Sequence, residues 1–359
     1  MKRIDLPASG SDARLDSAIA WLTSAGDRRW SEIASASADA SFRRYFRVID
    51  DEGRSAIVMD APPLLEDVRP FINVLNLLAG GGINVPTLYA SDLNQGFLLL
   101  GDLGRATYLQ ALEALAAGDA TEPQCAGVRT VLFGDAIETL IRLQRIAPSA
   151  AAVALPHFDA ALLRREIDLF PDWYIDKHVA ITLTDGERNA LERIYALLIA
   201  SALGQPAVLV HGDYMPRNLM AMPQGNPGVI DFQDAVIGPI SYDIASLMRD
   251  AFISWEEPQI IDWTARYWQS ARAAGLPVRD DFSEFYREFE WMGLQRHLKV
   301  LGIFARINYR DGKPKYLADA PRFLGYVRHV AARYSAFTPL LRLLNRMDGS
   351  ASPHVGYTF

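Results

Sequence analysis

The sequence changes its pattern near residue 101, and this change limits the folds open to the chain. Before it, short apolar runs alternate with turn residues, as β-strands do; the runs cover residues 43–50, 55–60, 85–91 and 96–103, with one helical stretch at 65–80. After it, apolar residues recur with helical spacing, over residues 107–117, 124–147, 157–170, 184–202 and 241–346. We therefore predict an α+β fold with a small β-rich lobe, residues 1–101, and a larger, mostly helical lobe, residues 102–359.

Charge and composition exclude several classes of protein. The net charge is -7, and acidic and basic residues are interspersed, so the sequence offers no basic face for a nucleic-acid backbone. The single cysteine, Cys125, excludes an intramolecular disulfide and any multi-cysteine metal site. No run approaches the ~18 uninterrupted apolar residues that a membrane span requires, and the N-terminus lacks the apolar core of a secretory signal. We expect a cytoplasmic monomer that binds neither nucleic acid nor membranes.

Residues 206–231 interrupt the helical part with two short apolar strands that carry polar residues. The first strand, residues 207–210, leads to Asp213, and Asn218 follows five residues later; the second ends in Asp231. We expect the two strands to form a hairpin-like unit with these three side chains at one end. Buried polar groups without partners are costly, which favours a chemical role. Phosphoryl transfer from a metal–nucleotide complex needs such groups, namely a carboxylate that orients the attacking hydroxyl and oxygen ligands for Mg²⁺. The alternative is a pair of ordinary turns with solvated side chains.

The segments "HGDYMPRN" and "IDFQDA" resemble the catalytic and metal-binding loops of the aminoglycoside phosphotransferase and choline kinase family, distant relatives of protein kinases. The resemblance implies a two-lobed, protein-kinase-like fold with ATP and Mg²⁺ bound. Carried over by position, it makes Asp213 the catalytic base and makes Asn218 and Asp231 the magnesium ligands. His211 would brace the loop, and Asp243 would support its backbone.

The nucleotide side departs from the family pattern. The segment "SADASFRRYFRV" stands where the family has its phosphate loop, so Ser41 and either Arg43 or Arg44 are candidates for binding phosphate. Met59 stands where kinases carry a strand lysine, and no lysine occurs between Lys2 and Lys177. Either an arginine replaces that lysine, or nucleotide affinity is low, or the protein is not an active kinase; we favour the arginine. "GFLLLGDLG" resembles the family's hinge, which implies adenine contacts near Leu100 and Asp102.

The acceptor is predicted from weaker motifs. "ASFRRYFR", "IVMDAPP" and "LLRREIDLFPDWYI" look like the bacterial anomeric amino-sugar kinases of peptidoglycan recycling, which use ATP to phosphorylate the C1 hydroxyl of N-acetylmuramate and N-acetylglucosamine. In the last segment, carboxylates can accept hydrogen bonds from sugar hydroxyls and aromatic rings can pack on pyranose C–H groups; alternatively, the rings belong to the core. Two other functions stay open, a kinase of another small hydroxyl compound such as choline or an aminoglycoside, and a non-catalytic nucleotide- or sugar-binding module. The candidate acceptor-binding residues are Glu166, Asp172, Trp173 and Tyr174.

Overall fold

The computed structural model describes residues 1–8, 10–25, 28–38, 42–118, 121–250 and 252–349 of the chain. The chain forms two compact units, each built from several segments of the sequence. The first unit contains residues 1–142, 149–154 and 217–234, and the second contains residues 143–148, 155–216 and 235–359. The chain therefore passes between the units several times, and the predicted lobe boundary at residue 101 stays a prediction.

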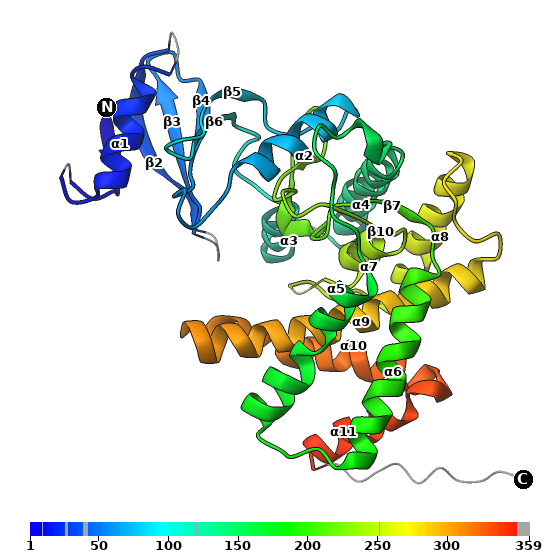
Figure 1. The fold of residues 1–359 in the computed structure, drawn as a ribbon. Helices are drawn as coiled ribbons and strands as arrows, with labels where there is room; N and C mark the ends of the chain where they lie inside the picture. Colours follow the sequence, from blue (N-terminus) through cyan, green and yellow to red (C-terminus); the bar gives the residue numbers. More distant parts are fainter. Residues whose placement is uncertain (9, 26–27, 39–41, 119–120, 251, 350–359) are drawn as a thin grey trace, which may run out of the picture. The chain divides into compact units, whose positions relative to one another are not determined.

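Among its described residues, the first unit contains a six-stranded sheet in the order β1-β2-β3-β4-β6-β5 (Figure 1). β1 is parallel to β2, and the other neighbouring strands are antiparallel. Strands β3 to β6 lie close to the predicted runs, whereas the sequence does not indicate β2, because serine and alanine make up much of it. The strands are β1 (Lys2–Ile4), β2 (Trp30–Ala38), β3 (Arg44–Asp50), β4 (Ser55–Asp60), β5 (Leu88–Asp92) and β6 (Phe97–Gly101).

Helix α1 (Ala13–Leu22) covers one face of this sheet, which we call the α1 face (Figure 1). The helix begins after Asp12, whose side chain accepts a hydrogen bond from the N–H of Leu15 at 3.0 Å. Leu15, Ala18 and Leu22 are buried against the sheet. Side chains of a strand alternate between its two faces, so the residues between the α1-facing ones lie on the opposite face. The strand residues packed on the α1 face are Ile33, Phe46, Val48, Ala56, Val58, Phe97 and Leu99.

Three helices and a short hairpin complete the first unit. Strands β8 (Leu219–Met220) and β9 (Gly228–Val229) pair antiparallel, and the predicted metal ligands belong to the same segment of chain, with Asn218 just before β8 and Asp231 two residues after β9. The ring of Phe71, on the second helix, lies 4.9 Å from the ring of Phe232, which fixes this helix against that segment. The helices are α2 (Arg69–Gly80), α3 (Tyr108–Ala117) and α4 (Glu122–Gln144), the last of which ends in the second unit.

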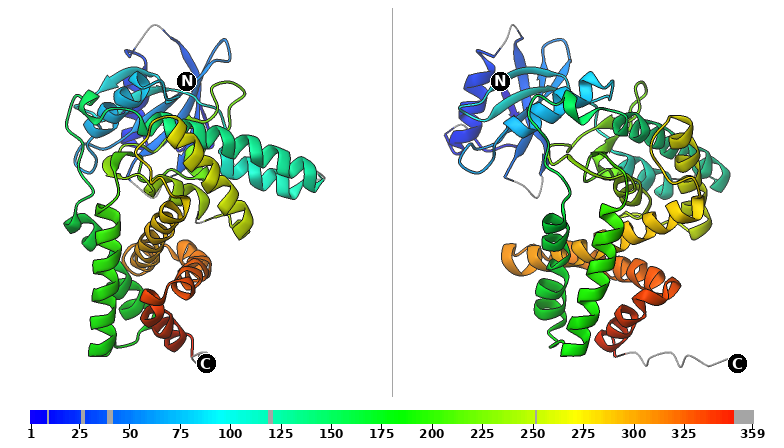
Figure 2. Two further views of the ribbon diagram at one scale, coloured as in Figure 1. Left: turned by 90° about the vertical axis from the view of Figure 1, so that its right-hand side faces the viewer. Right: turned by 45° about the vertical axis from the view of Figure 1, so that its right-hand side comes forward.

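The second unit is mostly helical, and its core surrounds the 30-residue helix α9 (Phe282–Asp311). Helices α6 and α10 lie beside α9, and α11 lies beside α10 and α6 (Figure 2). Helix α6 begins with a reciprocal cap, in which the side chains of Thr184 and Glu187 each bond the other residue's N–H. The other helices are α5 (Ala160–Ile167), α6 (Asp185–Leu203), α7 (Tyr242–Met248), α8 (Glu257–Ala273), α10 (Ala320–Arg333) and α11 (Thr338–Met347).

Two local predictions are wrong. Strand β7 (Ala207–Val210) pairs with β10 (Val236–Pro239) rather than with the strand before Asp231, so the predicted hairpin-like unit does not form. The predicted helix over 157–170 is α5 alone, and a π-helical segment, Phe170–Val179, follows it. In the part of the chain that the structure describes, no helix is long and apolar enough to cross a membrane.

Candidate active site

The loop that carries Asp213 leaves the end of β7. Gly212 has a φ of 92°, in the left-handed region that glycine adopts without strain. Asp243, in the first turn of α7, is fully buried and accepts hydrogen bonds from the N–H groups of His211 at 2.7 Å and Gly212 at 3.1 Å. Burial raises the pKa of Asp243 to about 6, although His211 and the two N–H donors oppose this rise. The Nδ1 atom of His211 accepts the N–H of Asp213 at 3.2 Å, so two side chains fix the backbone of the loop.

The carboxylate of Asp213 is exposed on one side and pairs with a buried arginine. Its side chain is 54% exposed, so a ligand can reach it. Arg296, on α9, is 4% exposed, and its Nη2 atom lies 3.5 Å from Asp213 Oδ1. Two other arginines of the second unit also have carboxylate partners: Arg249 pairs with Glu290, and Arg164 pairs with both Asp168 and Glu192.

A second polar cluster joins α5 to α9. Lys299 Nζ lies 2.6 Å from Glu166 Oε1 and donates to the hydroxyl of Tyr242 at 3.3 Å. Gln295, one turn earlier on α9, donates to Glu166 Oε2 at 3.2 Å. Burial lowers the pKa of Lys299, but Tyr242, Glu166 and Asp213 raise it above its ordinary value. The contribution of Asp213 to the pKa of Lys299 agrees with the cluster and the loop of Asp213 lying near each other within the second unit.

Of this cluster, the sequence predicts Glu166 alone as a site residue and does not single out Lys299, Gln295 or Tyr242. A signal exists, because the polar run Gln295, Arg296 and His297 stands between two leucines, Leu294 and Leu298, of a long helix. Such a run on a long helix indicates a polar cluster in the core, and Lys299 follows it by one turn.

The two predicted magnesium ligands lie together within the first unit. Asn218 Nδ2 is 3.3 Å from Asp231 Oδ2, and the N–H of Ile230 donates to the carbonyl oxygen of Asn218 at 3.1 Å. Gln233 Nε2 donates to Asp231 Oδ1 at 2.9 Å. Asp231 has a φ of 63°, a conformation that costs a residue other than glycine about 1–3 kcal/mol and is concentrated at functional sites. Mg²⁺ prefers hard oxygen ligands, and the residue pair supplies a carboxylate and a side-chain amide, although it is the amide nitrogen that faces Asp231 here.

The predicted hinge residues lie at the end of β6. Leu100 is within the ladder, opposite Ile57 of β4 and Leu88 of β5. The carboxylate of Asp102 pairs with Arg47 at 2.6 Å. Burial raises the pKa of Asp102, but hydrogen bonds from Arg47, Ser55 and Gly104 lower it below its ordinary value. This carboxylate therefore has a structural partner.

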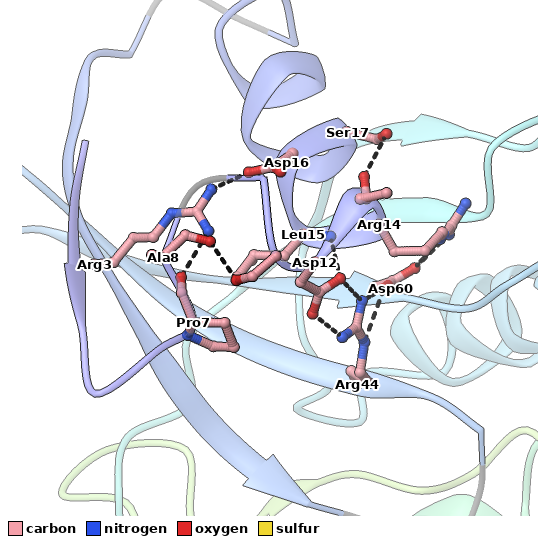
Figure 3. Close-up of polar contacts among 12 residues, drawn as sticks. Arg3, Pro7, Ala8, Asp12, Arg14, Leu15, Asp16, Ser17, Arg44 and Asp60 are labelled. Atoms are coloured by element: carbon pink, nitrogen blue, oxygen red, sulfur yellow. Dashed lines mark hydrogen bonds and ion pairs between the residues drawn. The ribbon is translucent and has the colours of Figure 1, made fainter.

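Two of the phosphate-loop candidates, Arg43 and Arg44, lie at the start of β3. Ser41 is outside the described residues. Arg44 bonds Asp12 and Asp60 beside α1 (Figure 3). Arg43 pairs with Glu66 through a contact of 3.4 Å between its Nε and Glu66 Oε2.

Three of the predicted acceptor-binding residues, Asp172, Trp173 and Tyr174, lie in the π-helical segment. Tyr174 is 4% exposed and stacks on Phe170 within the core of the second unit. Trp173 is partly buried and packs against the same core. Asp172 is exposed; partial burial raises its pKa, with smaller contributions from Asp168 and another neighbouring carboxylate. Tyr174 is thus a core residue in the structure.

Comparison with known proteins gives a consistent result. A sequence model of the phosphotransferase enzyme family matches residues 32–282. An N-acetylmuramate/N-acetylglucosamine kinase from Pseudomonas aeruginosa is 48% identical over 350 residues, which cover 95% of this chain and 98% of that protein. The protein of the same name from Pseudomonas putida is 47% identical with the same coverage. The solved GDP complex of wild-type aminoglycoside 2'-phosphotransferase-IIIa has a TM-score of 0.59 at 15% identity and covers 90% of this chain and 100% of that one. The predicted two-lobed, protein-kinase-like fold is confirmed.

Proposed function

The chain belongs to the phosphotransferase enzyme family, and we propose that it transfers the γ-phosphoryl group of ATP to the anomeric C1 hydroxyl of N-acetylmuramate and N-acetylglucosamine in peptidoglycan recycling. The observation that carries this proposal is the sequence identity of 47% and 48% with two amino-sugar kinases, which extends over 95% of this chain. Family and relatives together make the protein a nucleotide-using phosphotransferase with a small amino-sugar substrate. That the nucleotide is ATP is part of the proposal.

Asp213 acts as the base in this reaction. A bond forms between the C1 oxygen of the sugar and the γ-phosphorus, the bond from that phosphorus to the departing ADP breaks, and Asp213 accepts the hydroxyl proton. Its exposed carboxylate and its fixed backbone support this role. The anomeric hydroxyl is more acidic than an ordinary alcohol, so orientation accounts for much of the contribution of Asp213. Arg296 pairs with one carboxylate oxygen of Asp213 and so helps to orient this carboxylate.

Asn218 and Asp231 hold magnesium in this proposal. Their oxygen donors and their mutual distance of 3.3 Å between Nδ2 and Oδ2 fit that role once the amide turns its oxygen to the ion. When bound, the ion would neutralise negative charge on the phosphates. Gln233 steadies the carboxylate of Asp231 through its hydrogen bond.

The adenine lies against the opposite face of the sheet. Ile57 and Leu98 alternate with residues of the α1 face, so their side chains project to this opposite face. The hinge contact comes from the backbone near Leu100 and Asp102. Because Leu100 stands between two strands of the ladder, the residues after Gly101 are the better candidates for hydrogen bonds to the adenine.

The acceptor sugar binds at Glu166 and Lys299, and the buried Gln295 holds the carboxylate of Glu166 in place. Glu166 accepts hydrogen bonds from sugar hydroxyls, and Lys299 and Arg296 supply positive charge for the carboxylate that N-acetylmuramate carries. The electrostatic influence of Asp213 on Lys299 supports a position close to the reacting hydroxyl. Asp172, Trp173 and Tyr174 stay predictions, and the buried ring of Tyr174 favours its alternative role in the core.

One experiment tests the proposed function. The protein is incubated with Mg²⁺, each sugar and either ATP or GTP, and phosphorus NMR locates the transferred phosphate. We expect an anomeric phosphate with ATP, and no product with the methyl glycoside of N-acetylglucosamine, whose C1 oxygen is blocked. Phosphate on another hydroxyl, or a product from the methyl glycoside, would refute transfer to C1. Turnover with only choline or an aminoglycoside would favour the first alternative, and no turnover with any acceptor would favour the binding module.

A further inference from the structure

The face of the nucleotide sheet that should carry a lysine carries Met59 instead. Met59 lies on β4 opposite Tyr45 of β3 and Leu98 of β6, and it is fully buried. Its neighbour Val58 packs on the α1 face, so Met59 projects to the opposite face. A methionine cannot neutralise phosphate charge, and the first lysine after Lys2 is Lys177.

Arg44 does not face the side on which Met59 lies. It alternates with Tyr45 and shares the α1 face with Phe46. There its guanidinium bonds Asp12 at 2.5 Å and Asp60 at 2.6 Å, and Arg14 of α1 also pairs with Asp60 (Figure 3). Asp60 has no exposed side-chain surface, so these two arginines neutralise a buried carboxylate. Arg44 therefore joins α1 to the sheet.

Arg43 has a different set of neighbours. Its Nε atom lies 3.4 Å from Glu66 Oε2, and the two side chains are 12% and 19% exposed. Burial lowers the pKa of Arg43, but Tyr45, Glu66 and Asp231 raise it above its ordinary value. Tyr45 is on the strand face that also carries Met59, and Asp231 is a proposed magnesium ligand. Arg43 is thus a cation near the face of the sheet that carries Met59. It also interacts electrostatically with the loop that carries Asp231, which we call the metal loop.

Glu66 stands where it can hold this cation in place. It precedes helix α2 by three residues, and its N–H is fixed by a hydrogen bond to the carbonyl oxygen of Pro62 at 2.9 Å. Phe71 of the same helix contacts Phe232, the residue after Asp231. Helix α2 therefore links the partner of Arg43 to the metal loop.

We propose that Arg43, oriented by Glu66, binds the phosphates of the nucleotide and replaces the strand lysine that Met59 displaces, whereas Arg44 has a structural role. The inference rests on the proposed use of ATP and deepens it. A guanidinium presents several N–H donors in one plane and can bond two phosphate oxygens at once. Arg43 touches the nucleotide in this proposal, and Glu66 is a positioning residue.

The test measures nucleotide binding without any acceptor sugar, by calorimetry with Mg·ADP and with the non-hydrolysable Mg·AMPPNP. Arg43→Met should weaken both ligands at least about tenfold, the loss expected for one charged hydrogen bond to phosphate. Arg43→Lys should weaken both ligands less than Arg43→Met does, because the ammonium restores the charge but not the two-point contact. Glu66→Gln should weaken binding less than Arg43→Met does. Arg44→Met is the matched control; it should lower Tm and leave both dissociation constants within twofold of wild type.

A rescue variant separates a direct role from a general disturbance. Met59→Lys in the Arg43→Met protein returns a cation to the family's position, and we expect it to recover much of the lost affinity. Unchanged binding in Arg43→Met, or an equal loss in Arg44→Met, would overturn the proposal. If Arg43→Met does not fold, Arg43→Gln and Arg43→Lys give the same comparison. Because no sugar is present, an error in the proposed acceptor leaves the result intact, whereas absence of nucleotide binding by the wild-type protein would contradict the proposed function itself.

Discussion

At the scale of single residues, Asp213 is the side chain on which the proposed chemistry depends most. Asp213→Asn removes the proton acceptor but keeps the size of the side chain. We expect kcat to fall by about 10²–10⁴, the usual contribution of a positioned base, with the dissociation constant of Mg·ATP unchanged. Steady-state kinetics and calorimetry measure the two effects.

Asp262→Asn is a suitable control for this variant. Asp262 has a side-chain exposure of 53%, close to that of Asp213, and it pairs with Arg266 on its own helix, α8. We expect its kcat to equal that of wild type. Retention of more than about a tenth of the wild-type kcat by Asp213→Asn would mean that the activation free energy rises by less than ~1.4 kcal/mol. Asp213 would then not be the base.

The sequence identifies some candidate residues and leaves others undecided for a physical reason. Asp213 and Asn218 belong to one loop, so their spacing along the chain is itself the signal. Arg43 and Arg44 are adjacent, and what distinguishes them is the partner that each side chain meets at the start of β3, which depends on strand register and on the positions of α1 and of Glu66. Lys299 is joined to Glu166 from a distant helix, and no local pattern encodes that contact.

At the scale of elements, helix α9 has one glycine that its packing requires. A Cβ atom at Gly302 would lie 2.3 Å from the backbone carbonyl carbon of Leu169, in the segment that follows α5. Gly302→Ala must push the two segments apart, and overpacking of this kind costs about 1–3 kcal/mol. We expect a fall in Tm of several degrees, measured by calorimetry or circular dichroism.

Gly293→Ala, on the same helix, provides the comparison. There an added Cβ would meet the side chains of His297 and Arg249 at the ordinary contact distances of 3.7 and 3.8 Å. Alanine favours a helix over glycine by about 1 kcal/mol, so Tm should stay constant or rise. Equal effects of the two substitutions would mean that α9 and the Leu169 segment are not in close contact.

The elements that the sequence predicts poorly are those defined by long-range contacts. β10 is apolar and short, and its partner β7 lies more than 20 residues earlier, so pairing decides its identity. The π-helical segment begins at Phe170 and includes Pro171, which has no amide hydrogen and cannot continue the regular helical ladder of α5. Helices with clear periodicity and caps, such as α6, are predicted to within a few residues.

At the scale of the whole molecule, the change of pattern near residue 101 is sufficient to predict the fold class. Short apolar runs between turn residues predict strands, and apolar residues with helical spacing predict helices; segregation of the two along the chain favours an α+β fold. The division of the chain into compact units is harder to predict from the sequence. Residues 217–234 belong to the first unit, although the residues before and after them in the sequence belong to the second. That segment carries both proposed magnesium ligands, so its destination determines where the metal would bind.

The stability of the whole protein should therefore report metal-dependent nucleotide binding. A ligand at about 100 times its dissociation constant stabilises the folded protein by ~2.7 kcal/mol, so Mg·ATP should raise Tm by several degrees. ATP with EDTA should raise it much less, because the phosphates are then not neutralised beside Asp231. Asp231→Asn should lose the magnesium-dependent part of the shift while the fold persists, since asparagine tolerates the left-handed backbone at this position. Differential scanning calorimetry measures all three, with Mg²⁺ alone as the control. An equal shift with and without magnesium, or a full shift in Asp231→Asn, would show that the nucleotide binds without the pair Asn218 and Asp231.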